Sequence, residues 1–241
     1  MKVLSIGNSF SSDAHRYIHE LAKKAGVNIK TVNLYIGGCP LRTHYLNILD
    51  DAVAYDFVFN GVSTGLKVSI RQVLRSDDWD YVTLQQASGQ SAHPETYDPY
   101  IQTVAAYVRK YCPKAKLLIH QTWAYENGSE KLANQQIFAN DAEMFAAVEK
   151  AYAKAAELIS ADGIIPAGKA MLTASQTGIE KIHRDTYHAS LGAGRYLLAL
   201  CWFKYLTGRD ISENAFDDFD VPVTEEERKI VIAAVNKVLG E

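Results

Sequence analysis

Segments typical of strands and of helices alternate along this chain, and this alternation limits what it can fold into. Short apolar runs that end at turn residues predict strands at residues 3–6, 28–36, 81–85, 117–120 and 164–165. Helical patterns occupy residues 12–25, 41–52, 70–74, 100–111, 141–159, 190–206 and 224–239, and residues 55–67 are interrupted by glycines and predict a short hairpin. Roughly five strand–helix alternations are typical of an α/β fold, a parallel sheet wrapped by helices.

One domain over residues 1–241 is the organisation that the length and composition favour. A chain of 241 residues can bury a substantial core, and it contains no repeat, low-complexity tract or Pro/Gly/Ser-rich linker that would divide it. Its content of 48% hydrophobic and 22% charged residues is that of an ordinary soluble globular protein.

Charge and terminal sequence predict which partners and compartment suit the chain. The net charge of −3 gives no reason to expect nucleic acid or an anionic membrane as a partner. No apolar run approaches the ~20 residues of a membrane span, and the first strand begins at Lys2 with no signal peptide before it. Three cysteines without metal-ligand or CxxC spacing are compatible with a reducing compartment. We expect a cytoplasmic protein, with a leader already removed as the alternative; the oligomeric state is left open.

The first loop of the predicted sheet is rich in serine. Ligands of parallel sheets bind at the carboxyl ends of the strands, where "LSIGNSFSSDAH" (residues 4–15) turns from the first strand into a helix. Ser9 at this bend could attack a carbonyl carbon, while its own backbone N–H helps to hold the oxyanion that forms. The alternative is structural: Gly7 and Asn8 make the turn, and Ser12 or Asp13 caps the helix.

Two further loops offer donors for the same oxyanion. Gly38 follows the second strand, and a glycine lets its backbone N–H approach a ligand closely. Gln86 ends the third strand in "TLQQASGQS" (residues 83–91) and could turn its side-chain amide toward the oxyanion, whereas Gln85 points the other way by alternation. The structural alternative for Gly38 is a tight strand-to-helix connection, and for Gln86 it is a polar loop that forms hydrogen bonds within itself.

A base and a carboxylate for such a serine occur late in the chain, in "IHRDTYHAS" (residues 182–190). Asp185 and His188 are three residues apart, so the carboxylate can reach one ring nitrogen of the imidazole and leave the other to face Ser9. Helix capping by Asp185 is the structural alternative. His183 competes as the base, but it has no carboxylate three residues before it.

These blocks resemble the SGNH (GDSL-like) hydrolases. The likeness lies in Gly7-Asn8-Ser9-Phe10-Ser11 after the first strand, Gly38 after the second and Asp185-x-x-His188 near the C-terminus. It implies a flavodoxin-like three-layer α/β/α sandwich and a serine esterase with a Ser9–His188–Asp185 triad that needs no cofactor. A G-x-S-x-G motif, which an α/β-hydrolase would have, is absent from the sequence.

Two positions depart from the family pattern and point to one of its branches. Asn8 stands where the family has an Asp, and the third block has no Asn after a Gly. The chain there is more similar to sialate O-acetylesterases and acetylxylan esterases, in which a Gln at the strand end takes that place, so the resemblance assigns this role to Gln86. It implies a small acyl group, acetate above all, on an ester of a carbohydrate.

Three other side chains are candidates for substrate binding. His44 follows the Gly38 loop, and Trp123 and Tyr125 lie just beyond the carboxyl end of a predicted strand, where aromatic faces could stack on a sugar ring. For both aromatic residues, packing under a loop is an equal alternative.

Two other functions remain as alternatives to a serine hydrolase. In a metal-dependent hydrolase, His183, Asp185 and His188 would be the ligands, although their spacing is not a standard zinc motif. In a non-catalytic module, the same fold would bind a sugar or an acyl group without reacting with it.

Overall fold

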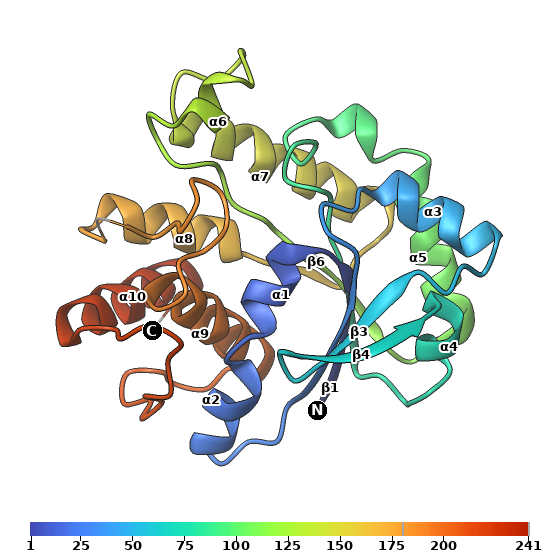
Figure 1. The fold of residues 1–241 in the computed structure, drawn as a ribbon, viewed down its shortest axis with the longest axis horizontal. Helices are drawn as coiled ribbons and strands as arrows, with labels where there is room; N and C mark the ends of the chain where they lie inside the picture. Colours follow the sequence, from blue (N-terminus) through green and yellow to red (C-terminus); the bar gives the residue numbers. More distant parts are fainter. Residues whose placement is uncertain (180, 241) are drawn as a thin grey trace.

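The computed structural model describes residues 1–179 and 181–240, which form three layers with a sheet in the middle (Figure 1). In this part of the chain the sheet has seven strands in the order β4-β3-β2-β1-β5-β6-β7. Their bounds are β1 (Lys2–Gly7), β2 (Lys30–Tyr35), β3 (Tyr55–Phe59), β4 (Val62–Val68), β5 (Tyr81–Leu84), β6 (Lys116–His120) and β7 (Gly163–Ile165). The run from β2 to β7 is parallel throughout, so the predicted three-layer α/β/α fold with its parallel sheet is confirmed.

An antiparallel pair extends the sheet beyond the strands that were predicted to form it. β3 pairs with β2, and β4 pairs with β3, both antiparallel. Asn60 and Gly61 connect β3 to β4 with φ angles of 46° and 78°, the left-handed conformation that a two-residue hairpin turn requires. Residues 55–67 therefore form the predicted hairpin, and this hairpin joins the central sheet as its edge.

Each face of the sheet has its own helices and its own apolar core (Figure 1). One core contains side chains of α1 (Ser9–His15), α2 (Ile18–Lys24), α8 (Ala167–Gln176), α9 (Ala193–Thr207) and α10 (Glu225–Leu239). The other contains side chains of α3 (Leu41–Leu49), α4 (Ile70–Leu74), α5 (Tyr100–Tyr111) and α7 (Asp141–Leu158). Alternation along β1 connects the two, because Val3 belongs to the first core and Leu4 and Ile6 to the second.

The loops after β5 and β6 contain two short helices, η1 (Pro94–Thr96) and α6 (Glu130–Ala133). Both lie beyond the carboxyl ends of their strands, where the sequence predicts the chemistry to be. Within residues 1–179 and 181–240, no helix combines the length and the apolar character needed to cross a bilayer.

The first helix differs from its prediction at both ends. It begins at Ser9 rather than at residue 12, because Asn8, and not Ser12 or Asp13, is the cap: its side chain accepts a hydrogen bond from the Phe10 N–H. The helical segment is also divided into α1 and α2 by a turn at residues 16–17. The earlier start places Ser9 in the first turn of α1, directly beyond β1.

Candidate active site

Ser9, His188 and Asp185 form a continuous line of hydrogen bonds, although 179 residues of sequence separate the first two. Ser9 Oγ lies 2.7 Å from His188 Nε2, and His188 Nδ1 lies 2.7 Å from Asp185 Oδ2. The other carboxylate oxygen of Asp185 accepts a hydrogen bond from the His188 backbone N–H at 2.9 Å. With Nδ1–H donating to the carboxylate, Nε2 is left to accept the hydroxyl proton of Ser9.

The sharp bend that presents Ser9 is built from its immediate neighbours. Asn8 is extended and caps α1 through Phe10, and Ser11 Oγ in turn accepts a hydrogen bond from the Asn8 N–H at 3.1 Å. A Cβ on Gly7 would lie 2.2 Å from Ser11 Oγ, so the bend leaves no room for a side chain there. Gly7, Asn8 and Ser11 thus form the turn and the cap around Ser9, and they orient its hydroxyl toward His188.

A buried set of hydrogen bonds connects this bend with the loop at Gly38 and with the carboxyl ends of β5 and β6, which follow β1 in the order of the sheet. His120 Nδ1 lies 2.9 Å from Gln85 Oε1, Gln85 Nε2 donates to Asn8 Oδ1 at 2.7 Å, and Asn8 Nδ2 donates to the Cys39 carbonyl at 3.2 Å. Burial lowers the pKa of His120 to about 3, so its imidazole is neutral and donates through Nδ1. Asn8 therefore joins the bend at Ser9 to the Cys39–Pro40 peptide of the next loop, a role that sequence reasoning missed.

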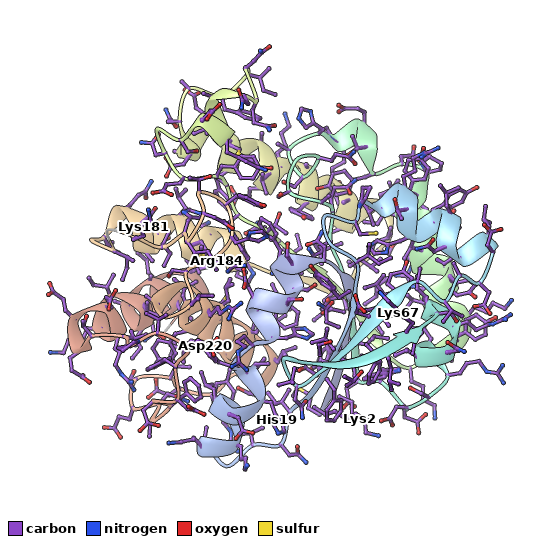
Figure 2. The ribbon with its side chains drawn as sticks, viewed as in Figure 1. Lys2, His19, Lys67, Lys181, Arg184 and Asp220 are labelled. Atoms are coloured by element: carbon purple, nitrogen blue, oxygen red, sulfur yellow. The ribbon has the colours of Figure 1, made fainter. Side chains whose placement is uncertain are left out.

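The segment with Asp185 and His188 is fixed to α1 by a buried carboxylate. Asp13, only 1% exposed, accepts hydrogen bonds from Arg184 Nη1 at 2.9 Å on each of its oxygens and from Arg195 Nε at 2.9 Å. Arg184 also donates its backbone N–H to the His188 carbonyl at 3.0 Å. Figure 2 shows Arg184 beside α1. The helix that begins with Ser9 is thus tied to the loop that contains its partner.

The surroundings of Asp185 keep its carboxyl group ionised, whereas those of His183 keep its imidazole neutral. Partial burial works to raise the pKa of Asp185, but hydrogen bonds from the side chain and backbone of His188 outweigh it, and the pKa lies below its ordinary value. Burial lowers the pKa of His183 to about 4, and its Nε2 lies 3.1 Å from the Ala124 carbonyl. Asp185 is therefore the ionised partner of His188, and His183 is bonded away from Ser9.

A cavity of about 730 Å³ opens over Ser9 and His188. Its other lining residues come from the segments at the carboxyl ends of β1, β2, β5 and β6, from α6 and from the loop between α8 and α9: Asn8, Phe10, Tyr35, Gly37, Gly38, Pro40, Ala87, Ser88, Gly89, Gln90, Tyr125, Lys131, Arg184 and Tyr187. Gly38 has a φ of 63°, which only a glycine adopts without strain, and nothing lies within 4 Å of a Cβ built on it. Ser9 and Gly38 thus line the same cavity.

The structure corrects the prediction for Gln86. Its side chain is fully buried, and both ends of its amide are in use. Gln86 Nε2 donates to the carbonyl and the hydroxyl of Thr96, each at 3.1 Å, and Oε1 accepts from the N–H groups of Leu41 and Ala87, each at 2.9 Å. Gln86 therefore braces the loops behind the cavity and does not line it.

Two of the three predicted substrate-binding residues also lie outside the cavity. His44 is fully buried with its Nδ1 2.9 Å from the Tyr55 hydroxyl, and burial lowers its pKa to about 3. Trp123 is 1% exposed and stacks on Phe10 at 4.3 Å between ring centroids, so it packs against helix α1. Tyr125 does border the cavity, as a nearly buried part of its wall.

The three residues proposed as metal ligands do not converge. His188 is engaged with Ser9 and Asp185, whereas His183 is directed at the Ala124 carbonyl. Over residues 1–179 and 181–240, no three His, Cys, Asp or Glu side chains are grouped so that they could hold a metal ion.

Comparisons with known proteins give the chain a family and a set of structural relatives. The model of a family described as a domain of unknown function, DUF4886, matches residues 2–235. A DUF4886 family protein from Bacteroides uniformis has 33% sequence identity and a TM-score of 0.91, with 99% of this chain and 94% of that one covered. A search of curated proteins found no match.

More distant solved structures share the fold. A candidate SGNH hydrolase from Slackia heliotrinireducens has 21% identity and a TM-score of 0.62 over 86% of this chain and 98% of that one. An acetylxylan esterase from Geobacillus stearothermophilus has 17% identity and a TM-score of 0.52 over 86% and 94%. The predicted resemblance to the SGNH hydrolases is confirmed in the fold, and the chain belongs to the DUF4886 family.

Proposed function

We propose that this protein is a serine esterase that hydrolyses small acyl esters. The observation that carries the proposal is the line Ser9–His188–Asp185, with both contacts at 2.7 Å, at the base of an open cavity. An aligned nucleophile, base and carboxylate is the arrangement that acyl transfer to a serine requires.

In the first half of the reaction, Ser9 Oγ attacks the ester carbonyl carbon while its proton passes to His188 Nε2. Asp185 holds the imidazole in one tautomer and stabilises the imidazolium that forms. The N–H groups of Ser9 and Gly38 are proposed to hold the negative charge that develops on the carbonyl oxygen. When the tetrahedral intermediate collapses, the C–O bond to the alcohol breaks and His188 gives its proton to the departing oxygen.

In the second half, water takes the place of the alcohol. His188 removes one proton from it, the resulting oxygen attacks the acyl-Ser9 carbonyl, and the bond to Ser9 Oγ breaks as His188 returns the proton to the serine. Each half uses the same base and the same oxyanion donors, and the net reaction consumes one water and one ester and yields one acid and one alcohol.

We infer that the acyl group is small, acetyl above all, and that the alcohol belongs to a carbohydrate. One structure of the same fold is that of an acetylxylan esterase. A cavity of about 730 Å³ has room for a sugar unit with a short acyl group, and the tyrosines Tyr35, Tyr125 and Tyr187 are among the residues that line it.

Steady-state hydrolysis of p-nitrophenyl acetate, butyrate and octanoate tests the proposal. The native protein is expected to turn over the acetate with the highest kcat/KM, and Ser9→Ala is expected to lose roughly 10³-fold or more because the nucleophile is gone. Ser63→Ala, on the exposed edge strand β4, is the matched serine control and is expected to keep full activity.

Two outcomes would contradict the proposal. Turnover by Ser9→Ala equal to that of the native protein would mean that another group does the chemistry. A folded native protein that binds acetylated sugars but hydrolyses no ester would instead be a binding module.

A further inference from the structure

The cavity over Ser9 differs in charge from the rest of the protein. The chain has 28 Asp and Glu against 25 Lys and Arg, yet the cavity lining contains Lys131 and Arg184 and no acidic residue. Such a lining raises the local concentration of negatively charged molecules and disfavours positively charged ones.

Of these two cations, Lys131 is the one whose charge remains to be balanced. Arg184 forms its ion pair with the buried carboxylate of Asp13 at 2.9 Å. Among the described residues, no carboxylate oxygen lies within 4.0 Å of the Lys131 ammonium group. Lys131 is nevertheless half-buried, and a half-buried ammonium group gains from an anionic partner more than an exposed one does.

Aromatic rings hold Lys131 next to the proposed base. Its Nζ lies 3.9 Å from the ring centroid of Tyr187 and 5.5 Å from that of Tyr125. The ring of Tyr187 in turn lies 4.0 Å from the ring of His188. A cation–π contact fixes the position of the ammonium group but leaves N–H donors for a ligand.

The chemistry of the reaction places the alcohol half of the substrate on this same side. His188 Nε2 must protonate the departing oxygen, so the alcohol has to lie against His188, with the carbonyl oxygen turned toward the Gly38 loop. Lys131 and Tyr187 are the residues that continue the cavity wall beyond His188.

We propose that the alcohol half of the natural substrate carries an anionic group, a carboxylate or a phosphate, and that Lys131 binds it. This inference rests on the proposed esterase function and names the class of ester that the same site selects. Lys131 acts as a specificity residue: its charge favours acidic esters over neutral ones and takes no part in the acyl transfer itself.

Matched esters that differ in one anionic group provide the test. 5-Acetoxy-2-nitrobenzoate carries a carboxylate meta to its acetyl ester, and methyl 5-acetoxy-2-nitrobenzoate is the neutral partner. 4-Acetoxyphenyl phosphate and 4-acetoxyphenyl methyl ether make the same comparison for phosphate. The native protein is expected to show a kcat/KM about tenfold higher for the anionic member of at least one pair, and the pair that responds distinguishes carboxylate from phosphate.

Variants of Lys131 then assign the preference. Lys131→Gln is expected to bring the ratio close to one, Lys131→Glu to invert it, and Lys131→Arg to keep it. Lys110→Gln is the control, because Lys110 also lies over an aromatic ring, 5.3 Å from the centroid of Tyr111, but outside the cavity. For the native protein, the preference for anionic esters is expected to weaken as salt is raised to about 1 M. This measurement does not depend on whether any variant folds.

The result separates this inference from the function on which it rests. Equal kcat/KM for charged and neutral members of both pairs, or a preference that Lys131→Gln leaves unchanged, would overturn the role of Lys131 while the esterase stands. Failure of the native protein to hydrolyse any of the four esters would overturn the proposed function, and this inference with it.

Discussion

Replacing His188 by alanine is expected to lower kcat/KM for ester hydrolysis by roughly 10³- to 10⁶-fold. The imidazole is the only described group within hydrogen-bond distance of the Ser9 hydroxyl, so without it the hydroxyl has no base and the departing alcohol has no acid. Steady-state rates on p-nitrophenyl acetate, with folding checked by circular dichroism, measure the loss.

Two companion variants make this result specific. The double variant Ser9→Ala/His188→Ala is expected to be no less active than either single variant, because the pair acts as one unit. His183→Ala is the matched histidine control: its ring contacts the Ala124 carbonyl and not Ser9, so its loss of activity is expected to be far smaller. Equal losses for His183→Ala and His188→Ala would mean that the base is assigned to the wrong histidine.

Asp13→Asn is expected to lower the free energy of unfolding by about 3 kcal/mol. Asp13 is 1% exposed and pairs with both Arg184 and Arg195. Its replacement by an isosteric amide removes the buried carboxylate from both guanidinium groups, of which Arg195 keeps a second partner in Asp220 at 2.6 Å. Urea denaturation followed by circular dichroism measures the change as a shift in midpoint at constant slope.

The same carboxylate contributes to the geometry of the site, because Arg184 joins α1 to the backbone of His188. We therefore expect Asp13→Asn also to reduce kcat/KM in the absence of denaturant, where the variant is folded. Asp217→Asn is the control, since Asp217 pairs with Lys24 at an exposed position, and it is expected to change neither quantity. An unfolding midpoint for Asp13→Asn equal to that of the native protein would show that the two ion pairs add nothing to stability.

The elements that could be predicted are those with a local physical signature. The parallel strands were predictable as short, largely apolar runs, because strands buried on both faces contain few polar residues. Asp185 and His188 were predictable as a contacting pair because three residues of separation already bring a carboxylate to the imidazole. That Ser9 meets them was expected from the family resemblance and not from topology, because the segment with Asp185 and His188 follows helix α8 and not a strand.

The start of α1 and the helix α8 show where local signatures are insufficient. Five nearby residues, Asn8, Ser9, Ser11, Ser12 and Asp13, are all of types that cap helices, and contacts with Gln85 and Cys39 favour Asn8. α8 was not predicted: its buried face consists mainly of alanine and glycine, which give little hydrophobic periodicity.

Gln86 illustrates why the rest of the site could not be predicted. Strand alternation places Gln85 and Gln86 on opposite faces, but it does not tell what each amide will meet. Gln86 is enclosed by Thr96 and Leu41, and Gln85 by Asn8 and His120, so both amides serve the structure. The orientation of a polar side chain at a strand end depends on loops that are distant in sequence, and no spacing rule encodes it.

Covalent labelling tests the central claim most directly, because it needs no knowledge of the substrate. A fluorophosphonate is attacked by a serine only when a base activates it, and the phosphonylated residue is then found by peptide mass spectrometry. We predict one adduct per chain on Ser9 of the native protein, and strongly slowed labelling in His188→Ala. An unlabelled Ser9 in the folded native protein, or an adduct on any other serine, would contradict the account.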